Sequence, residues 1–319
     1  MLEKISNANF PVDSEGRTYH VSTKPGETAN RILTVGDPAR LHRISKHLDE
    51  WPEPFEKVSQ RGYTTITGRY KGVPISLIAI GMGVAMTDFF VREVRAVVKG
   101  EIAIVRFGSC GSLDPSFKVA SLGVPEQALM ITTNYNYFQS QGTEKEGEPY
   151  LISNPIKADS ELQRHLFETL EREAKDEETE VRSLKLHASA DCFYSSQGRI
   201  DTNFQDDNKD LISTLLKRNP DCASLEMETG HLLHLASVVS PTLPIRAAAV
   251  HAVFAGRAKE GGQGDFIDPK RVASLEPRVG KACLDALVAF DIPQDKLHPE
   301  AGSVWEYKEK TGHVDLPIS

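Results

Sequence analysis

The feature that most constrains the fold is the alternation of short apolar runs with helical patterns along most of the chain. The runs expected to be buried strands are Ile32–Val35, Tyr63–Thr67, Ile75–Ile80, Ile102–Phe107, Leu129–Thr132, Leu184–Ser189, Ala223–Glu226 and Ile245–Phe254. The candidate amphipathic helices are Ala85–Lys99, Ser160–Lys175, Thr229–Val239 and Arg271–Phe290. This alternation predicts a three-layer α/β/α sandwich around a central mixed β-sheet. Ligands are expected at the strand ends, where the loops gather.

The composition is typical of a globular protein. The 319 residues, of which 39% are hydrophobic and 26% charged, can bury one large core or two modest ones. We expect a single domain over residues 1–290 and a C-terminal extension, residues 291–319, that packs on or near it. The polar stretches Gln139–Pro149 and Glu171–Glu180 are expected to be loops rather than linkers.

Charge and cysteine content exclude several functional classes. A net charge of −8 provides no overall basic field, so neither nucleic acid nor a membrane surface is an expected partner. The four cysteines lie far apart without metal-ligand spacing, which favours free thiols and no zinc. Residues 1–10 lack the apolar centre of a signal peptide, and no apolar stretch is long enough to span a bilayer. We therefore expect a cytoplasmic protein.

The segment Gly36-Asp37-Pro38-Ala39-Arg40 lies between a strand-like run and a helical pattern. Asp37 fits an N-cap, and Pro38 fits the first helical position, where its missing N–H has no partner to lose. The free N–H groups at such a helix start attract anions, and Arg40 would point toward the same place. Taken alone, an arginine such as Arg40 on a first helical turn is more often a solvated surface residue. With its neighbours, it indicates a phosphate site.

A second segment, Arg106-Phe107-Gly108-Ser109-Cys110-Gly111, follows another strand-like run. Gly108 and Gly111 would let the backbone approach a ligand closely, and Ser109 offers a hydroxyl. A guanidinium at a buried strand end is costly without a partner, so Arg106 should meet either a carboxylate or a bound anion. A third such segment is Gln197-Gly198-Arg199.

These segments belong to a longer, ordered set of motifs. From about His20 to Phe290 the chain resembles the uridine phosphorylases, within the purine nucleoside and uridine phosphorylase superfamily. The matching motifs are Gly36-Asp37-Pro38-x-Arg40, Ser59-x-Arg61, Arg106-x-Gly108-Ser109-x-Gly111, Phe193-Tyr194-x-x-Gln197-Gly198-Arg199 and Glu226-Met227-Glu228. The resemblance implies a nucleoside phosphorylase fold and a pentosyltransferase that reversibly converts uridine and phosphate into uracil and ribose 1-phosphate. It also implies a place in pyrimidine salvage and no cofactor, since inorganic phosphate is a substrate.

The resemblance further implies a role for each matching residue. Phosphate would be bound by Gly36, Arg40, Arg61, Arg106 and Ser109. The base would be bound by Phe193, Gln197 and Arg199, and the ribose by His20, Met227 and Glu228. Because His20 and Arg61 would come from the neighbouring subunit, the minimal active unit would be a homodimer, which could assemble further into a hexamer.

Arg106, Arg199 and Glu228 are the residues expected to be catalytic. Breaking an N-glycosidic bond develops positive charge on the sugar and negative charge on the departing base. A carboxylate near the ribose and a guanidinium near the base therefore fit this chemistry. Phosphate held by arginines needs to be aimed rather than deprotonated, so no general base is expected.

The sequence departs from the bacterial pattern at the subunit interface. Gly62 and Met86 stand where bacterial enzymes supply a carboxylate and a hydroxyl to a potassium ion, so we expect no bound metal. The remaining histidines, including His187 and His251, show no ligand spacing and are expected to be packing or surface residues.

Two other interpretations stay open. One is a purine nucleoside phosphorylase or a nucleosidase of the same fold. A nucleosidase uses water and needs no arginine clamp, and Gly256-Arg257 lies where purine enzymes place an aspartate. The other is a catalytically silent nucleoside-binding protein, for which the altered interface and the C-terminal extension are the motivation. The retained phosphate, base and ribose residues weigh against that interpretation.

Overall fold

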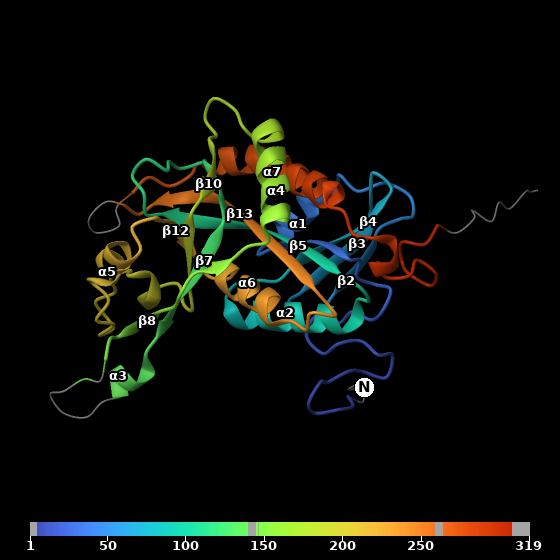
Figure 1. Ribbon diagram of the computed structural model, residues 1–319, viewed down its shortest axis with the longest axis horizontal. Helices are drawn as coiled ribbons and strands as arrows, with labels where there is room; N and C mark the ends of the chain where they lie inside the picture. The colour runs from blue at the N-terminus through green and yellow to red at the C-terminus, as the bar shows by residue number, and fades with distance from the viewer. Residues whose placement is uncertain (1–4, 140–144, 146, 259–263, 308–319) are drawn as a thin grey trace, which may run out of the picture.

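The computed structural model describes residues 5–139, 145, 147–258 and 264–307. A twisted sheet runs through the molecule, and helices cover both of its faces (Figure 1). Part of the expected Gln139–Pro149 loop and residues 308–319 of the C-terminal extension lie outside the described residues.

The central sheet mixes parallel and antiparallel strands. Its hydrogen-bonded order is β2 (Phe55–Val58), β3 (Thr64–Tyr70), β4 (Val73–Ala79), β1 (Arg31–Val35), β5 (Ile102–Ser112), β12 (Cys222–Glu226), β11 (Leu186–Ala190), β7 (Gln127–Thr133) and β8 (Tyr150–Ile152). Off this path lie β13 (Ile245–Gly256), β6 (Leu122–Pro125), β10 (Val181–Leu184) and β9 (Ile156–Lys157). Strands β4, β1, β5 and β13 run parallel, whereas β12 meets the end of β5 in antiparallel register. The mixed sheet follows the prediction.

Helices form the two outer layers. One face of the sheet is covered by α1 (Pro38–Ser45), α4 (Ser160–Glu173) and α7 (Pro269–Ala289), and the other by α2 (Val84–Val97) and α6 (Thr229–Val238) (Figure 1). The shorter helices α3 (Tyr135–Gln139) and α5 (Leu211–Arg218) lie near β8. The 3₁₀ segments η1 (Ser195–Gln197) and η3 (Gln294–Lys296) complete the described elements. The three-layer α/β/α sandwich is confirmed.

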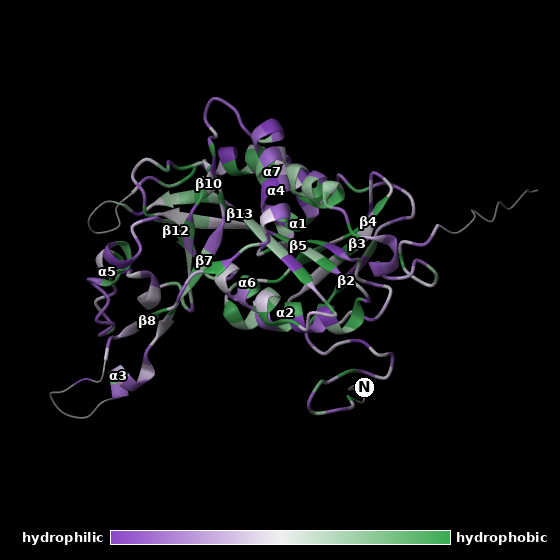
Figure 2. Cartoon of the chain, in the orientation of Figure 1, coloured by the Kyte–Doolittle hydropathy of each residue, from purple (hydrophilic) through white to green (hydrophobic). Residues whose placement is uncertain are grey.

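Strand β1 shows why the inner strands are buried along their whole length and rich in apolar residues. All five of its residues are buried, because helices cover both faces of the sheet. Leu33 and Val35 pack in the core beneath α1 and α7, while Ile32 packs in the core beneath α2 and α6. In Figure 2 apolar residues gather on the strands and on parts of the helices, whereas hydrophilic residues are frequent along the outer loops.

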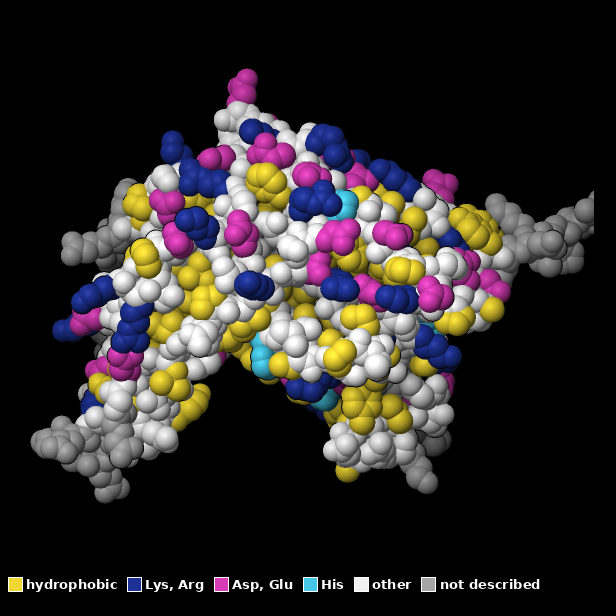
Figure 3. Space-filling model, in the orientation of Figure 1, with side chains coloured by type: hydrophobic (Ala, Val, Ile, Leu, Met, Phe, Trp, Pro, Cys, Tyr) yellow, Lys and Arg dark blue, Asp and Glu magenta, His cyan; other side chains and the backbone are white. Residues whose placement is uncertain are grey.

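The helices α1, α4 and α7 begin at aspartate caps. Asp37 Oδ1 accepts a hydrogen bond of 2.9 Å from Ala39 N at the start of α1, as predicted. Asp159 and Asp268 cap α4 and α7 in the same way. On the face in Figure 3, Lys and Arg side chains are interspersed with Asp and Glu over these helices, so opposite charges neutralise one another locally.

The expected boundaries need two corrections. The run Leu184–Ser189 is not one strand, because the exposed Lys185 separates β10, which pairs with β6, from β11, which pairs with β12 and β7. The expected loop Glu171–Glu180 begins later than predicted, since α4 continues to Glu173. The apolar face of α4 packs against α7, and this packing stabilises the last turn of the helix.

The described part of the C-terminal extension lies against the sheet. Ile292 and Trp305 are 4% and 1% exposed. Arg69 Nε on β3 donates to the Trp305 carbonyl at 2.9 Å, and the backbone N–H of His298 donates to Asn30 Oδ1 at 2.7 Å. Among the described residues, no helix has both the length and the apolar character needed to cross a bilayer.

Candidate active site

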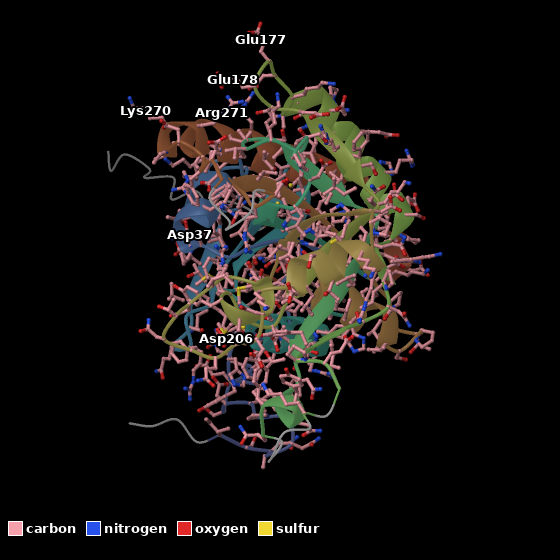
Figure 4. All side chains as sticks on the ribbon, turned by 90° about the vertical axis from the view of Figure 1, so that its left-hand side faces the viewer. Asp37, Glu177, Glu178, Asp206, Lys270 and Arg271 are labelled. Carbon is pink, nitrogen blue, oxygen red and sulfur yellow. The ribbon has the colours of Figure 1, made fainter. Side chains whose placement is uncertain are left out.

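A cavity of about 490 Å³ opens at the carboxyl ends of β1, β5, β12 and β13. The predicted site residues that line it are Gly36, Arg40, Arg106, Ser109, Phe193, Gln197, Arg199, Met227 and Glu228. The three arginine-bearing segments of the sequence therefore meet in one place. Figure 4 labels Asp37, which also lines the cavity, beside the start of α1.

Arg40 is buried in the wall of the cavity rather than solvated, with 6% of its surface exposed. Its Nε donates to Glu276 Oε1 at 2.8 Å, its Nη1 donates to the Phe107 carbonyl at 3.3 Å, and its guanidinium lies over the Phe107 ring. Burial lowers the pKa of Arg40, although the Glu276 carboxylate opposes that shift. The site therefore contains a fixed cation whose partner Glu276, on α7, was not predicted from the sequence.

Arg106 at the inner end of the cavity meets two carboxylates. Its Nε lies 3.3 Å from Glu226 Oε2, and its Nη2 donates to Glu228 Oε2. Its Nη1 is buried and has no hydrogen-bond partner among the described residues. The sequence left a choice between a core carboxylate and a bound anion. The structure shows the carboxylates, which use two of the three nitrogens, and it also places Arg106 in the cavity wall, where its charge can act on an anion.

The two glutamates differ in their ionisation. Burial tends to raise the pKa of Glu226, but contacts with His187 and the charge of Arg106 hold it well below its usual range. Burial raises the pKa of Glu228 to about 7, with a contribution from the neighbouring Glu226 and against the attraction of Arg106. Glu228 Oε1 also accepts a hydrogen bond from the backbone N–H of Gly83. One carboxylate is thus a permanent anion and the other titrates near neutrality.

The segment after β11 forms the opposite end of the cavity. The Arg199 guanidinium lies 3.9 Å from the centre of the Phe193 ring, and its Nε donates to the Phe193 carbonyl at 3.0 Å. Between them, Gly198 has a φ of +62°, and a Cβ there would lie 2.9 Å from Ile212 Cγ1. Only glycine fits this turn. An aromatic face and a cation are therefore held together where a flat heterocycle could stack.

Three further residues in or beside the cavity were not predicted as site residues. Phe254 and Phe266 line the cavity. Arg257 lies behind Gly111, where a Cβ would approach its Cδ to 2.9 Å. Its Nη1 is buried without a partner among the described residues, and burial, with the nearby charge of Arg199, lowers its pKa to about 10. The sequence showed Arg257 only as part of Gly256-Arg257, in the region where purine enzymes of the family place an aspartate.

His20 and Arg61 do not line the cavity of their own chain. His20 stacks on Phe89 with ring centres 3.7 Å apart, and its Nδ1 contacts Glu93. Arg61 is exposed and donates to the hydroxyl of Tyr19. The structure thus gathers these two residues around Tyr19, outside the cavity. Their predicted contribution to a neighbouring subunit stays a prediction.

His187 and His251 are buried, as packing residues are, but they also contact polar groups at the site. Together with Glu226 they place potential metal-ligand atoms within 4.8 Å of one another. Glu226 already accepts hydrogen bonds from Ser189, Thr229 and the backbone of Glu228, and it pairs with Arg106. Because its lone pairs are engaged and a guanidinium lies beside it, this cluster is better suited to polar support than to a cation.

Comparison with known sequences identifies related enzymes. Over 279 residues the chain is 34% identical to the uridine phosphorylase of Thermococcus kodakarensis, a match that covers 86% of this chain and 90% of that protein. A DeoD-type purine nucleoside phosphorylase of Caldanaerobacter subterraneus is also 34% identical, but only over 111 residues, or 35% of this chain and 47% of that one.

Comparison with solved structures agrees with the fold. A structure from work on two uridine phosphorylases of the oomycete Phytophthora capsici matches with a TM-score of 0.84 and 34% identity, over 91% of this chain and 100% of that chain. A Trypanosoma brucei nucleoside phosphorylase shares the fold at a TM-score of 0.72 and 20% identity, over 88% and 100% of the two chains. Residues 30–289 match the family described as the Phosphorylase superfamily. The chain belongs to the Phosphorylase superfamily.

Proposed function

We propose that the protein is a uridine phosphorylase, a pentosyltransferase that reversibly converts uridine and inorganic phosphate into uracil and ribose 1-phosphate. One observation carries the proposal: Arg40, Arg106, Arg199 and Glu228 line a single cavity at the strand ends. The likeness to the Thermococcus kodakarensis uridine phosphorylase over most of both chains supports the same activity.

Phosphate would lie at the inner end of the cavity. The Gly36 backbone would supply an N–H group, Ser109 a hydroxyl, and Arg40 and Arg106 positive charge. Arg106 Nη1 has no partner among the described residues, but it is buried, so a phosphate oxygen would reach it only after a small shift of the guanidinium. A nucleosidase would have no use for this pair of buried arginines.

Ribose and base would occupy the rest of the cavity. Glu228 would accept hydrogen bonds from the ribose hydroxyls, with Met227 beneath the sugar. Phe193 would cover the base, Gln197 would read its amide edge, and Arg199 would face its exocyclic oxygen. His20 and Arg61 would complete the sugar and phosphate sites from the other subunit of a homodimer, or of a hexamer built from such dimers.

The proposed reaction depends on the charges that develop on the base and on the sugar as the glycosidic bond breaks. The C1′–N1 bond breaks and its electron pair stays on uracil, where Arg199 would stabilise the negative charge on the exocyclic oxygen. A phosphate oxygen bonds to C1′, and Glu228 would stabilise the positive sugar. The proton of hydrogen phosphate ends on N1 of uracil, so the equation balances without a cofactor or a general base. We place this reaction in pyrimidine salvage in the cytoplasm.

Incubation with uridine tests the proposal, with uracil release followed with and without inorganic phosphate. Phosphate-dependent release of uracil and ribose 1-phosphate is the expected result. Phosphate-independent release would indicate a nucleosidase instead, and binding without turnover would indicate a silent nucleoside-binding protein. Inosine should be assayed in parallel as a second substrate, because part of the chain is 34% identical to a DeoD-type purine nucleoside phosphorylase. Faster release of hypoxanthine than of uracil would reverse the assignment.

A further inference from the structure

A chain of buried polar groups runs behind the cavity to Arg106. His251 Nε2 on β13 lies 2.9 Å from Thr229 Oγ1, at the start of α6. Thr229 Oγ1 lies 3.1 Å from Glu226 Oε2, and that oxygen lies 3.3 Å from Arg106 Nε. His251 and Thr229 are both fully buried, so water cannot replace any of these contacts without a local opening.

The direction of each hydrogen bond follows from the available protons. Glu226 is ionised and can only accept, so the single hydroxyl proton of Thr229 points to Glu226. Thr229 must then accept from His251, which therefore carries its proton on Nε2. Burial holds the pKa of His251 well below its usual value, so the imidazole is neutral and has one N–H to give. Each link of the chain thus depends on the one before it.

The position of His251 is itself tightly set. Its ring stacks on His187 with centres 4.4 Å apart and planes 6° from parallel. A Cβ built on Gly108 would lie 2.6 Å from His251 Nδ1 and 3.5 Å from Arg106 Nε. His187 Nδ1 is in turn 2.8 Å from Ser224 Oγ. The imidazole is therefore packed against a second buried ring and against strand β5, which carries Ser109.

We propose that His251 is a positioning residue for phosphate binding, acting through Thr229 and Glu226 on Arg106. The chain holds Glu226 against Arg106 Nε, and this fixes the guanidinium in the cavity wall, where its positive charge would attract phosphate. His251 touches no substrate in this role. The inference rests on the proposed function, because it assigns Arg106 to phosphate.

Inorganic phosphate binding to the full chain, measured by calorimetry, tests the proposal together with steady-state phosphorolysis of uridine. His251→Leu, which removes the N–H, should raise both the Kd and the KM for phosphate about five- to tenfold, as expected for one lost hydrogen bond. The KM for uridine should change less than twofold. His251→Gln keeps an N–H near the same place and should recover most of the phosphate affinity.

Thr229→Val breaks the same chain with almost no change in side-chain volume. It should raise the phosphate Kd as His251→Leu does, and the double variant should be no worse than either single variant. If His251→Leu does not fold, Thr229→Val and His251→Gln still test the chain. The matched control is His298→Leu, which removes another buried, hydrogen-bonded imidazole in the C-terminal segment. It should lower Tm without changing phosphate affinity.

Unchanged phosphate binding in His251→Leu and Thr229→Val would overturn this inference and leave the proposed function standing. Additive losses in the double variant would overturn it too, as would equal losses of phosphate and uridine binding, because both indicate a merely structural role. A wild-type chain that neither binds phosphate nor cleaves uridine would overturn the proposed function and this inference with it.

Discussion

The buried guanidiniums of Arg40 and Arg106 are both neutralised by protein carboxylates and yet line the same cavity. An unpaired charge in such surroundings would cost several kcal/mol, so Glu276, Glu226 and Glu228 stabilise the arginines before any ligand binds. Each arginine has more donors than its carboxylate partners use, and a planar fork can bind an anion with those left over. Burial at this site therefore fixes the arginines without saturating them.

Alanine substitutions should separate the two ends of the cavity. We expect Arg199→Ala to lower kcat for uridine about 100-fold, because it removes the cation at the departing base. Arg40→Ala should mainly raise the KM for phosphate. Arg43→Ala is the control, since Arg43 shares Glu276 with Arg40 but does not line the cavity. Steady-state kinetics with each substrate varied would measure this. The same small effect for all three variants would contradict the site.

The pH dependence of catalysis should reflect Glu228. Its pKa is raised to about 7, so below that pH a growing fraction of the enzyme carries a protonated, neutral Glu228. Because we propose that the ionised form stabilises the sugar cation, kcat/KM for uridine should rise with pH up to about 7 and then level off. Glu228→Gln should be much less active and should lose this titration. A wild-type profile already flat from pH 5 to 8 would exclude the role.

Strand β5 shows how packing against a neighbouring strand restricts the residues that an element can carry. Gly108 has no room for a side chain, because a Cβ would lie 2.6 Å from the fixed ring of His251. The strand nevertheless continues past Gly108 to Ser112, and it pairs with β13 along most of its length. The glycine expected to serve ligand approach is thus required by the packing of β5 on β13 as well.

Gly108→Ala should destabilise the protein by about 1–3 kcal/mol, as overpacking of a rigid core does, and should also weaken phosphate binding. Urea unfolding followed by circular dichroism would give the change in free energy. Gly256→Ala on β13 is the control, because a Cβ there meets only ordinary contacts at 3.8 Å or more. If both variants unfold at the same urea concentration as the wild type, His251 is not fixed as described.

The inner elements were predictable, and the outer ones were not. β1, β4, β5 and β13 are nearly continuous apolar runs because both faces are covered, and such runs stand out in a sequence. β2 was missed because its pattern, Phe-Glu-Lys-Val, is short, charged and partly exposed at the sheet edge. Short strands such as β9 owe their existence to the neighbour they pair with, and sequence does not display that neighbour.

At the scale of the whole molecule, the C-terminal segment, residues 291–307, packs against one side of the sheet. Trp305 is almost fully buried, and β3 binds its carbonyl through Arg69. Residues 291–307 are therefore in contact with the domain that they follow. The division of the chain at residue 290 and the assembly into a homodimer stay predictions.

Trp305→Ala should lower the free energy of unfolding by about 3–5 kcal/mol, the usual cost of emptying a buried aromatic site. Tyr307→Ala is the control, because Tyr307 is 54% exposed and contributes mainly a contact with Arg69. Its effect should stay below about 1 kcal/mol. Denaturant unfolding of both variants would measure the difference. A Trp305→Ala variant as stable as the wild type would show that the segment is only loosely attached.

The sequence by itself determined the layered fold and most of the cavity wall, because apolar runs, helix caps and glycine-bearing motifs are local patterns readable within a few residues. Only the tertiary structure decided which carboxylates face the arginines, that Arg257 lies beside Arg199, and that His251 reaches Arg106 through Thr229 and Glu226. These pairings join residues that are far apart along the chain. Their geometry depends on how the sheet and helices pack, which no local pattern records.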